Sequence, residues 1–329
     1  MTRHSITAAP ARITVEALLA AVRRRLEKAR LAYGHGTTNA RDEAAWLVLR
    51  ALRLPLDPPA PFLQRNVTPA EQRRTWRLVE RRIRQRLPAA YLLREAWLGE
   101  LRFYVDQRVI VPRSFIAELL RDRLAPWLRH SGRVRDALDL CTGSGCLAIL
   151  LAKTFSGARV DAVDISRNAL AVARRNIATY RLRSRIRLLH SDMFAAVKKK
   201  RYNLIIANPP YVNAAAMRAL PSEFRREPKL ALTGGKDGFD FVRIILKEAT
   251  EHLTDNGLLV VEIGHYRKQL EKAFPRLPFV WPLTSGGDDC VFILERRDLP
   301  EQAAPAMRRR IPRAGARPRR RRVPSADRA

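Results

Sequence analysis

The stretch Tyr202-Asn203-Leu204-Ile205-Ile206-Ala207-Asn208-Pro209-Pro210-Tyr211 predicts both the fold and the site of this chain. Its first six residues are mostly apolar and partly β-branched, so they indicate a buried strand, which two consecutive prolines end abruptly. In open α/β sheets, ligands bind beyond the carboxyl ends of the strands. Proline has no N–H, so this loop offers a carboxamide and backbone carbonyls, which are acceptors suited to an NH2 group. A purely structural turn is the alternative if the two prolines are taken alone.

Three strand ends upstream carry residues of a kind that binds nucleotides. The segment Asp139-Leu140-Cys141-Thr142-Gly143-Ser144-Gly145 joins a strand expected at residues 134–140 to a helix, and glycines there let the backbone approach a ligand closely. Asp164 ends the next expected strand, where a carboxylate can accept hydrogen bonds from ribose hydroxyls. Asp192 ends the third, with Met193 available to pack against a ring. Each acid alone is more often a helix cap, but the succession of these motifs predicts a cofactor site.

Strands and helices alternate from residue 134 onward, and this alternation predicts a doubly wound, mostly parallel sheet of the α/β class. Two final strands are expected around Val280 and at residues 291–294. We expect a small N-terminal helical domain, a β-hairpin linker, the sheet domain and a disordered basic tail. Their predicted ranges are 1–95, 96–113, 114–299 and 300–329.

Local signals predict where several elements begin and end. Thr68-Pro69-Ala70-Glu71 has the threonine, proline and glutamate of a helix N-terminus, and the second helix is expected from Asn39 to Leu52. Apolar residues at positions 103, 105, 109 and 111 alternate as they do in short strands. Ser114 follows this hairpin and is predicted to cap a helix that runs towards Trp127.

The charge of the chain points to a polyanionic partner. A formal net charge of +31 arises from 63 basic and 32 acidic residues, which favours nucleic acid most simply. The helix after Thr68 carries seven arginines between residues 73 and 86, and these form either a solvated basic face or a contact with RNA. Residues 308–322 contain nine arginines and no acid, so they predict a disordered extension that either binds phosphate or only solubilises the protein.

Cysteine, histidine and hydropathy patterns exclude several other classes of protein. Three cysteines show no disulfide or zinc spacing, and six scattered histidines show no metal-binding motif, so we expect no metal. No apolar run approaches the ~18 residues of a membrane-spanning helix. The chain is therefore expected in the cytoplasm and not in a membrane.

Together these motifs resemble the class I S-adenosylmethionine-dependent methyltransferases, and more narrowly the protein-glutamine methyltransferases, over roughly residues 91–294. One branch of that family acts on peptide-chain release factors and another on ribosomal protein L-three of the large subunit. Cys141 favours the second branch, because the release-factor branch usually has glycine there. The segments 103–106, 111–114 and 217–228 are also similar to the second branch, whereas Phe115 and Gly287-Asp288-Asp289-Cys290 depart from it.

The resemblance implies S-adenosyl-L-methionine as the cofactor and a role for each motif. The cofactor-binding residues that it implies are Asp139, Cys141, Thr142, Gly143, Ser144, Gly145, Asp164, Asp192, Met193 and Asn208. Asp164 is the expected ribose contact, and Asp192 with Met193 is the expected adenine contact. The catalytic residues that it implies are Asn208, Pro209, Pro210 and Tyr211, which hold a substrate glutamine. The implied reaction is methylation of the side-chain amide nitrogen of a glutamine in ribosomal protein L-three, recognised through residues 1–95.

Three other functions stay open at this point. Release-factor glutamine methylation is the nearest alternative. Methylation of the adenine amine in DNA or RNA is a second, since its target is also an NH2 group on a conjugated carbon and the basic charge suits it. A flipped base, however, needs a dedicated pocket and duplex contacts, and no base-reading insertion is apparent. A non-catalytic RNA-binding assembly factor is the third, against which the intact set of motifs argues.

Overall fold

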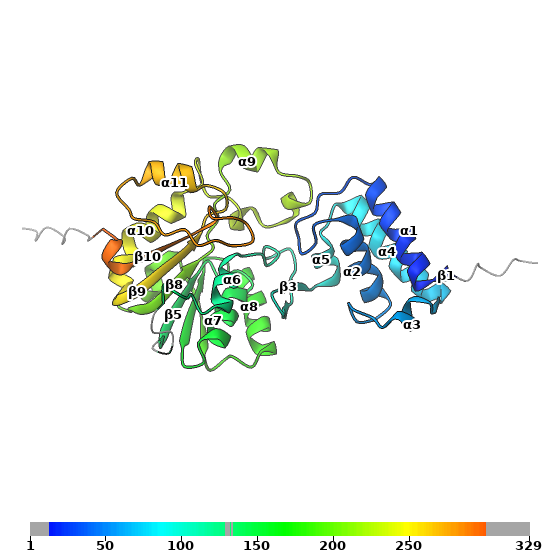
Figure 1. Cartoon of the computed structure of the whole chain (residues 1–329), viewed down its shortest axis with the longest axis horizontal. Coiled ribbons are helices and arrows are strands. Elements are labelled where there is room, and N and C mark those ends of the chain that lie inside the picture. Colours follow the sequence, from blue (N-terminus) through cyan, green and yellow to red (C-terminus); the bar gives the residue numbers. More distant parts are fainter. Residues whose placement is uncertain (1–12, 129–131, 133, 301–329) are drawn as a thin grey trace, which may run out of the picture.

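The computed structural model describes residues 13–128, 132 and 134–300, which form two lobes joined by a short connection (Figure 1). A helical lobe holds the N-terminal part of the chain, and a sheet lobe holds the C-terminal part. The predicted basic tail lies outside the described residues except for Pro300. Among the described helices, none combines the length and apolar character needed to span a membrane.

Within the described residues, a six-stranded sheet in the order β10-β9-β8-β5-β6-β7 forms the centre of the sheet lobe. All neighbouring strands run parallel except β10, which pairs antiparallel with β9 at the edge. The bounds are β5 Asp136–Leu140, β6 Arg159–Asp164, β7 Ile186–His190, β8 Tyr202–Ala207, β9 Leu253–Glu262 and β10 Val291–Glu295. The predicted doubly wound sheet is confirmed, and the strand order reverses between β5 and β8, where such folds bind ligands.

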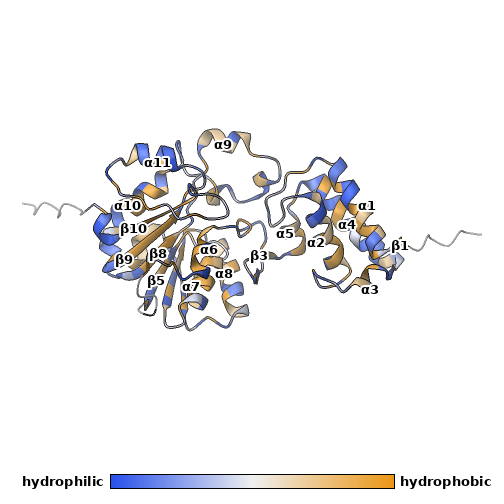
Figure 2. Ribbon diagram, viewed as in Figure 1, coloured by the Kyte–Doolittle hydropathy of each residue, from blue (hydrophilic) through white to orange (hydrophobic). Residues whose placement is uncertain are grey.

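Helices cover both faces of this sheet, because residues along each strand alternate between them. Leu204 and Ile206 of β8 face α6 (Ile116–Arg121), α7 (Cys146–Thr154) and α8 (Arg167–Thr179). Ile205 and Ala207 face α10 (Asp240–His252) and α11 (Arg267–Ala273). Figure 2 shows the apolar strands between these two helical layers. Burial on both faces explains the nearly continuous apolar runs of β8, β10 and the second half of β9.

The hydrophobic core of the helical lobe is built by α1 (Val15–Lys28), α2 (Ala40–Ala51), α4 (Pro69–Gln85) and α5 (Ala89–Leu93), and Ala169 and Val172 of α8 also contribute to it. The short helix α3 (Ala60–Leu63) and the pairing of β1 (Ile13–Thr14) with β2 (Asn66–Val67) complete the lobe. Both predicted helix starts are confirmed: Asn39 caps α2, and Thr68 and Glu71 form a reciprocal capping box on α4.

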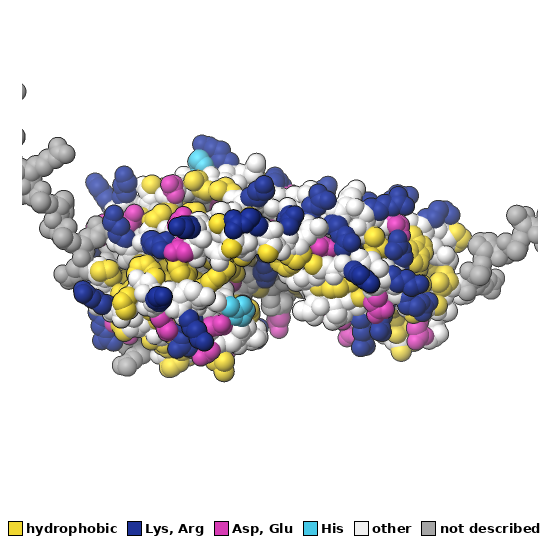
Figure 3. Space-filling view, turned by 90° about the horizontal axis from the view of Figure 1, so that it is seen from above, with side chains coloured by type: hydrophobic (Ala, Val, Ile, Leu, Met, Phe, Trp, Pro, Cys, Tyr) yellow, Lys and Arg dark blue, Asp and Glu magenta, His cyan; other side chains and the backbone are white. Residues whose placement is uncertain are grey.

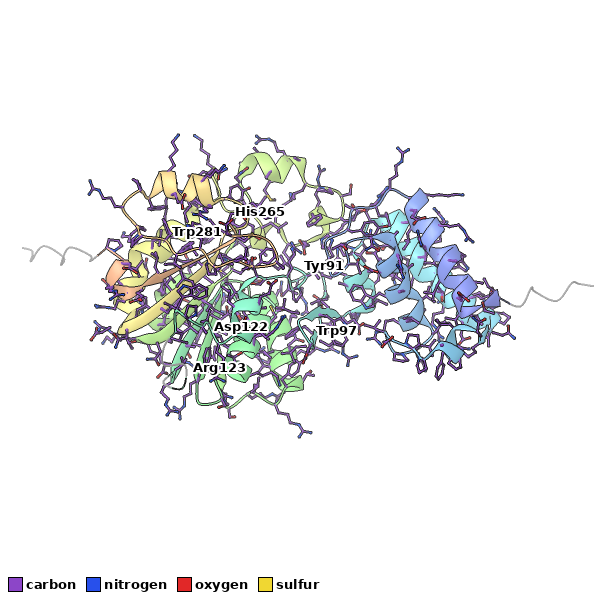
Figure 4. All side chains as sticks on the ribbon, viewed as in Figure 1. Tyr91, Trp97, Asp122, Arg123, His265 and Trp281 are labelled. Atoms are coloured by element: carbon purple, nitrogen blue, oxygen red, sulfur yellow. The ribbon has the colours of Figure 1, made fainter. Side chains whose placement is uncertain are left out.

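The connection between the lobes contains less β-structure than the sequence predicts. β3 (Ala96–Leu98) and β4 (Leu101–Phe103) form an antiparallel hairpin, but residues 105–111 form no strand. Val105, Val109 and Val111 are instead buried in the core of the helical lobe. The apolar alternation that suggests a strand therefore arises from loop side chains that point into this core. Tyr91, labelled at this junction in Figure 4, donates its hydroxyl to the Val109 carbonyl at 2.5 Å.

Two other predicted element ends are wrong. Ser114 does not cap α6, which ends at Arg121 rather than near Trp127; its hydroxyl donates to a carboxylate of β9 instead. The strand expected around Val280 is reduced to a single bridge with Ile293 of β10. In both cases a tertiary partner that the local sequence does not reveal determines the outcome.

Ion pairs to the buried carboxylates of Glu223 and Glu227 join the helical lobe and the connection to the sheet lobe. Arg82 of α4 is 0% exposed and pairs with Glu43 at 2.7 Å and with Glu223 at 3.4 Å. The expectation that every arginine of this helix lies on a solvated or RNA-facing surface is therefore wrong for Arg82. Arg113 pairs with Glu227 at 2.6 Å. Glu223 and Glu227 follow the Asn-Pro-Pro-Tyr segment and the short helix α9 (Ala214–Ala219), so the helical lobe anchors the chain that leaves this segment.

Candidate active site

A cavity of about 730 Å³, counted with the part that opens to solvent, lies at the carboxyl ends of β5, β6, β7 and β8. We call it the strand-end cavity. Of the residues predicted from the sequence, those that line it are Cys141, Gly143, Asp164, Asp192, Met193, Asn208 and Pro210. Those that do not line it are Asp139, Thr142, Ser144, Gly145, Pro209 and Tyr211. The structure thus gathers all four sequence motifs around one space, while the role of each residue stays a prediction.

The loop after β5 has an unusual backbone. Cys141, Gly143 and Gly145 have φ angles of 59°, 54° and 78°, in the left-handed region that favours glycine. A Cβ on Gly145 would lie 3.1 Å from the Cβ of Ala173 in α8, so close helix packing also requires this glycine. At Gly143 the nearest atom to such a Cβ is 4.0 Å away. Gly143 is therefore the position in this loop where a ligand can approach the backbone.

Asp139 lies behind this loop and is 0% exposed. Its Oδ2 accepts a hydrogen bond from Thr142 Oγ1 at 2.5 Å, and burial raises the pKa of its carboxyl to about 7. Its Oδ1 has no hydrogen-bond partner within the described residues. Asp139 therefore shapes the loop after β5 through Thr142 rather than facing the strand-end cavity.

Asp164 joins the ends of β5 and β6 at the wall of the cavity. Its two carboxylate oxygens each accept one backbone N–H, from Gly143 and from Ser166, both at 2.8 Å. Burial raises the pKa of this carboxyl from its ordinary value. A carboxylate oxygen can accept more than one hydrogen bond, so Asp164 keeps acceptor capacity for a ligand hydroxyl.

Asp192 and Met193 line the cavity at the end of β7. Asp192 is exposed, whereas Met193 is buried and begins the 3-10 helix Met193–Val197 with a positive φ of 40°. A non-glycine residue in this backbone region is strained, and such strain is typical of functional sites.

Asn208 has its side chain fixed by two oxygen atoms. Its Nδ2 donates to Glu262 Oε1 at 3.1 Å and lies 3.5 Å from the carbonyl oxygen of Arg113. Since both partners present oxygens, the NH2 end of the carboxamide points to them and Oδ1 points the other way. Glu262, at the end of β9, is 2% exposed, and burial raises the pKa of its carboxyl to about 7.

Tyr211 packs against glycines instead of lining the strand-end cavity. A Cβ on Gly264 would lie 2.9 Å from the Tyr211 ring, so the missing side chain at that position makes room for the aromatic group. Gly234 approaches the Pro210 carbonyl oxygen equally closely, since a Cβ there would lie 2.7 Å from it. The loop that carries Tyr211 is thus held between two glycine segments that the sequence analysis did not single out.

Several cavity residues were missed from the sequence. Ile165 follows Asp164 directly, and its 49% exposed apolar side chain was a usable signal. Leu230 is 55% exposed and belongs to the segment after Asn-Pro-Pro-Tyr. Arg108 and Phe241 reach the cavity from the connection and from α10, and nothing in their local sequence indicates this.

A second group of potential ligands lies at the ends of β9 and β10. His265, labelled in Figure 4, brings Nδ1 to 3.0 Å from Asp289 and 3.4 Å from the Cys290 thiol. The spacing of these residues in the sequence matches no metal-binding motif, yet the three side chains could hold an ion, since their ligand atoms lie within 4.8 Å of one another. Each contact is also an ordinary hydrogen bond, and burial raises the pKa of the Cys290 thiol to about 12.

Comparison with known proteins identifies the family. The model of the methyltransferase small domain matches residues 118–235. A ribosomal protein uL3 glutamine methyltransferase from Neisseria meningitidis serogroup A is 52% identical over 275 residues, which cover 84% of this chain and 90% of that protein. Its counterpart from Bordetella pertussis is 54% identical, with 84% and 92% covered. This chain belongs to the uL3 glutamine methyltransferase family.

Membership in the uL3 glutamine methyltransferase family makes this chain an enzyme and agrees with the branch that Cys141 and its neighbours indicate. Among solved structures, a methyltransferase from Pyrococcus furiosus is similar to 60% of this chain and 90% of its own, with 21% identity and a TM-score of 0.43. That likeness is too distant to support any argument about the site.

Proposed function

We propose that this chain transfers the methyl group of S-adenosyl-L-methionine to the side-chain amide nitrogen of a glutamine in ribosomal protein uL3. The relatives that cover most of the chain are named for methylation of uL3 glutamine. The observation that carries the proposal is the orientation of Asn208, which lines the strand-end cavity: its NH2 end binds Glu262, so its Oδ1 points away from Glu262 and is left as an acceptor. A hydrogen-bond acceptor is what an approaching glutamine NH2 group requires.

The residues of the cavity fit S-adenosyl-L-methionine. Gly143 leaves open space beside the backbone, where a side chain would otherwise stand. Asp164 has carboxylate oxygens with acceptor capacity left for the ribose hydroxyls, and Asp192 is exposed at the end of β7 for the adenine amine. When bound, S-adenosyl-L-methionine supplies an electrophilic methyl group on a positively charged sulfur.

An amide nitrogen is a poor nucleophile, because its lone pair is delocalised into the carbonyl. In our proposal, Asn208 Oδ1 and the carbonyl oxygen of Pro209, which follows Asn208 directly but does not itself line the strand-end cavity, accept hydrogen bonds from the two N–H groups of the substrate and aim its nitrogen at the methyl group. Both acceptors also stabilise the positive charge that grows on this nitrogen during transfer. Holding both reactants in place supplies on the order of 7–11 kcal/mol, so no strong base is needed first. The nitrogen loses its proton to water afterwards.

We further propose that ribosomal RNA helps to bring the enzyme to its substrate in the cytoplasm. Ribosomal proteins are generally basic, so this basic chain should repel free uL3 at long range. If uL3 is instead already bound to ribosomal RNA, the same charge becomes attractive. The exposed arginines that support such a contact are those of α4: Arg73, Arg74, Arg77, Arg81 and Arg84.

Methyl transfer from labelled S-adenosyl-L-methionine into a ribosomal lysate tests the proposed activity, with mass spectrometry of every labelled protein. We expect one glutamine of uL3 to gain a single methyl group. Asn208→Ala should keep cofactor affinity but lose roughly a hundredfold or more in kcat, because one acceptor for the developing charge is gone. Label in a release factor or in RNA, with none in uL3, would contradict the proposed substrate.

A further inference from the structure

Glu262 lies where three segments that are distant in the sequence meet. It ends β9, its Oε1 accepts from Asn208 Nδ2 at 3.1 Å, and it is 2% exposed. Its Oε2 accepts from the Ser114 hydroxyl at 2.5 Å and from the Phe115 backbone N–H at 2.9 Å. One carboxylate therefore receives three donors, one from the loop after β8 and two from the turn before α6.

The three donors are not interchangeable. The N–H of Phe115 and the NH2 end of Asn208 can only donate, and the Ser114 hydroxyl donates to the same oxygen as Phe115. A carboxylate is the side chain that satisfies donors on both of its ends at once, because both of its oxygens accept. A carboxamide of the same shape accepts on one end only, so it must present an NH2 group to one set of donors.

We propose that Glu262 is a positioning residue for methyl transfer: it holds the Asn208 carboxamide with its NH2 end turned inward, so that Oδ1 faces the substrate amide. This inference rests on the proposed function, since it assigns the group that orients the acceptor used there. Without Glu262, only the Arg113 carbonyl oxygen, at the longer distance of 3.5 Å, still favours this orientation, and rotation of the Asn208 carboxamide by half a turn would bring its NH2 group to face the substrate NH2 group. Glu262 acts through Asn208 and does not itself touch the substrate.

The proposal predicts a specific effect of Glu262→Gln on the full-length enzyme. If the introduced carboxamide turns its oxygen to Ser114 and Phe115, its NH2 group faces the NH2 group of Asn208 and forces the Asn208 side chain to flip. We expect kcat on a uL3 glutamine peptide to fall by roughly tenfold to a hundredfold. KM for the peptide and the Kd for S-adenosylhomocysteine should change by less than about threefold, because the substrate and cofactor contacts outside Asn208 remain.

A reversed pair provides the decisive control. In Asn208→Asp combined with Glu262→Gln, the glutamine NH2 donates to one oxygen of the aspartate, and the other oxygen faces the substrate as Oδ1 does. Asn208→Asp alone places two carboxylates side by side and should lose activity. We expect the double variant to have a higher kcat than the product of the two single effects predicts, which is the coupling that a direct contact produces.

Ser114→Ala is a milder variant that keeps the carboxylate and removes one of its donors, and we expect kcat to fall by a few fold with KM unchanged. A wild-type kcat in Glu262→Gln would overturn the positioning role. So would a double variant whose loss in kcat equals the product of the losses in the two single variants. If Glu262→Gln does not fold, an unchanged kcat in Ser114→Ala would overturn it. Absence of methyl transfer by the wild-type enzyme would instead contradict the proposed function, so the two failures are distinguishable.

Discussion

At the scale of single residues, Asp164 tests the assignment of the cofactor site. It binds backbone N–H groups of Gly143 and Ser166 and lines the strand-end cavity. Asp164→Ala should weaken the binding of S-adenosylhomocysteine by about 1.5–3 kcal/mol, the range for hydrogen bonds to a charged group. Titration calorimetry measures this directly.

Asp161 provides the matched control for Asp164, because it lies on the same strand, is 3% exposed and pairs with Arg187 away from the cavity. Asp161→Asn should lower the free energy of unfolding but leave cofactor affinity within about twofold, because no cavity contact changes. Equal losses of affinity in both variants would mean that general destabilisation, and not a ribose contact, explains the effect of Asp164→Ala.

Residues at strand ends were predictable from the sequence, but residues that support them were not. Asn208 directly follows the apolar run of β8, Asp164 is the last residue of β6, and Asp192 stands two residues after β7, so their place at one edge of the sheet follows from the fold alone. Glu262 ends an equally apolar run, yet its role in the site is its hydrogen bond with Asn208, which lies 54 positions away in the sequence. A contact between distant segments leaves no periodic signal in either one, so only the folded arrangement identifies it.

At the scale of elements, the hydrophobic periodicity of the sequence predicted the regular helices and strands. It failed where contacts between distant segments determine the local structure. The strand at residues 202–207 is found with the predicted bounds, because burial on both faces gives it a nearly continuous apolar pattern. Alternation at Val105 and Val109 suggested a strand, but these side chains enter the core of the helical lobe from a loop. Arg82 looked like its neighbours on α4, although it faces inward by its position on the helix.

The buried Arg82 makes α4 a structural support for the segment after Asn-Pro-Pro-Tyr. Removing it leaves Glu43 buried at 2% exposure without its cation, whereas Glu223 keeps Arg86 at 3.2 Å. We expect Arg82→Met to lower the free energy of unfolding by about 3–5 kcal/mol, the cost of breaking a buried ion pair from one side. Arg81→Met, on the exposed face of the same helix, should change it by less than about 0.5 kcal/mol. Urea denaturation of both variants measures the two free energies of unfolding. Similar denaturation midpoints for the two variants would contradict the structural role of Arg82.

At the scale of the whole molecule, positive charge spreads over both lobes. Figure 3 shows Lys and Arg side chains distributed along the length of the face that it presents, with acidic groups interspersed. The formal net charge is +31, and the nine arginines of residues 308–322 lie outside the described residues. A basic surface of this extent raises encounter rates with a polyanion and does not require a shaped pocket. The net charge therefore does not identify the part of this surface that binds RNA, and substitution of particular arginines is needed to locate it.

The arginines of α4 give the sharpest test of the proposed RNA contact. Arg73, Arg77 and Arg81 are exposed and lie at helical spacing on one face. Replacing all three with serine should slow methylation of uL3 in assembly particles at low salt, while a short glutamine peptide is methylated at the wild-type rate. The difference should shrink as salt rises, because each lost phosphate contact lowers the slope of log affinity against log salt by about 0.9 for a duplex.

Serine at Arg174, Arg181 and Arg183, which are also exposed, removes the same charge from the sheet lobe and serves as the control. Equal slowing by the two triple variants would show that net charge alone acts, and no slowing by the α4 variant would leave this helix as a solvated face.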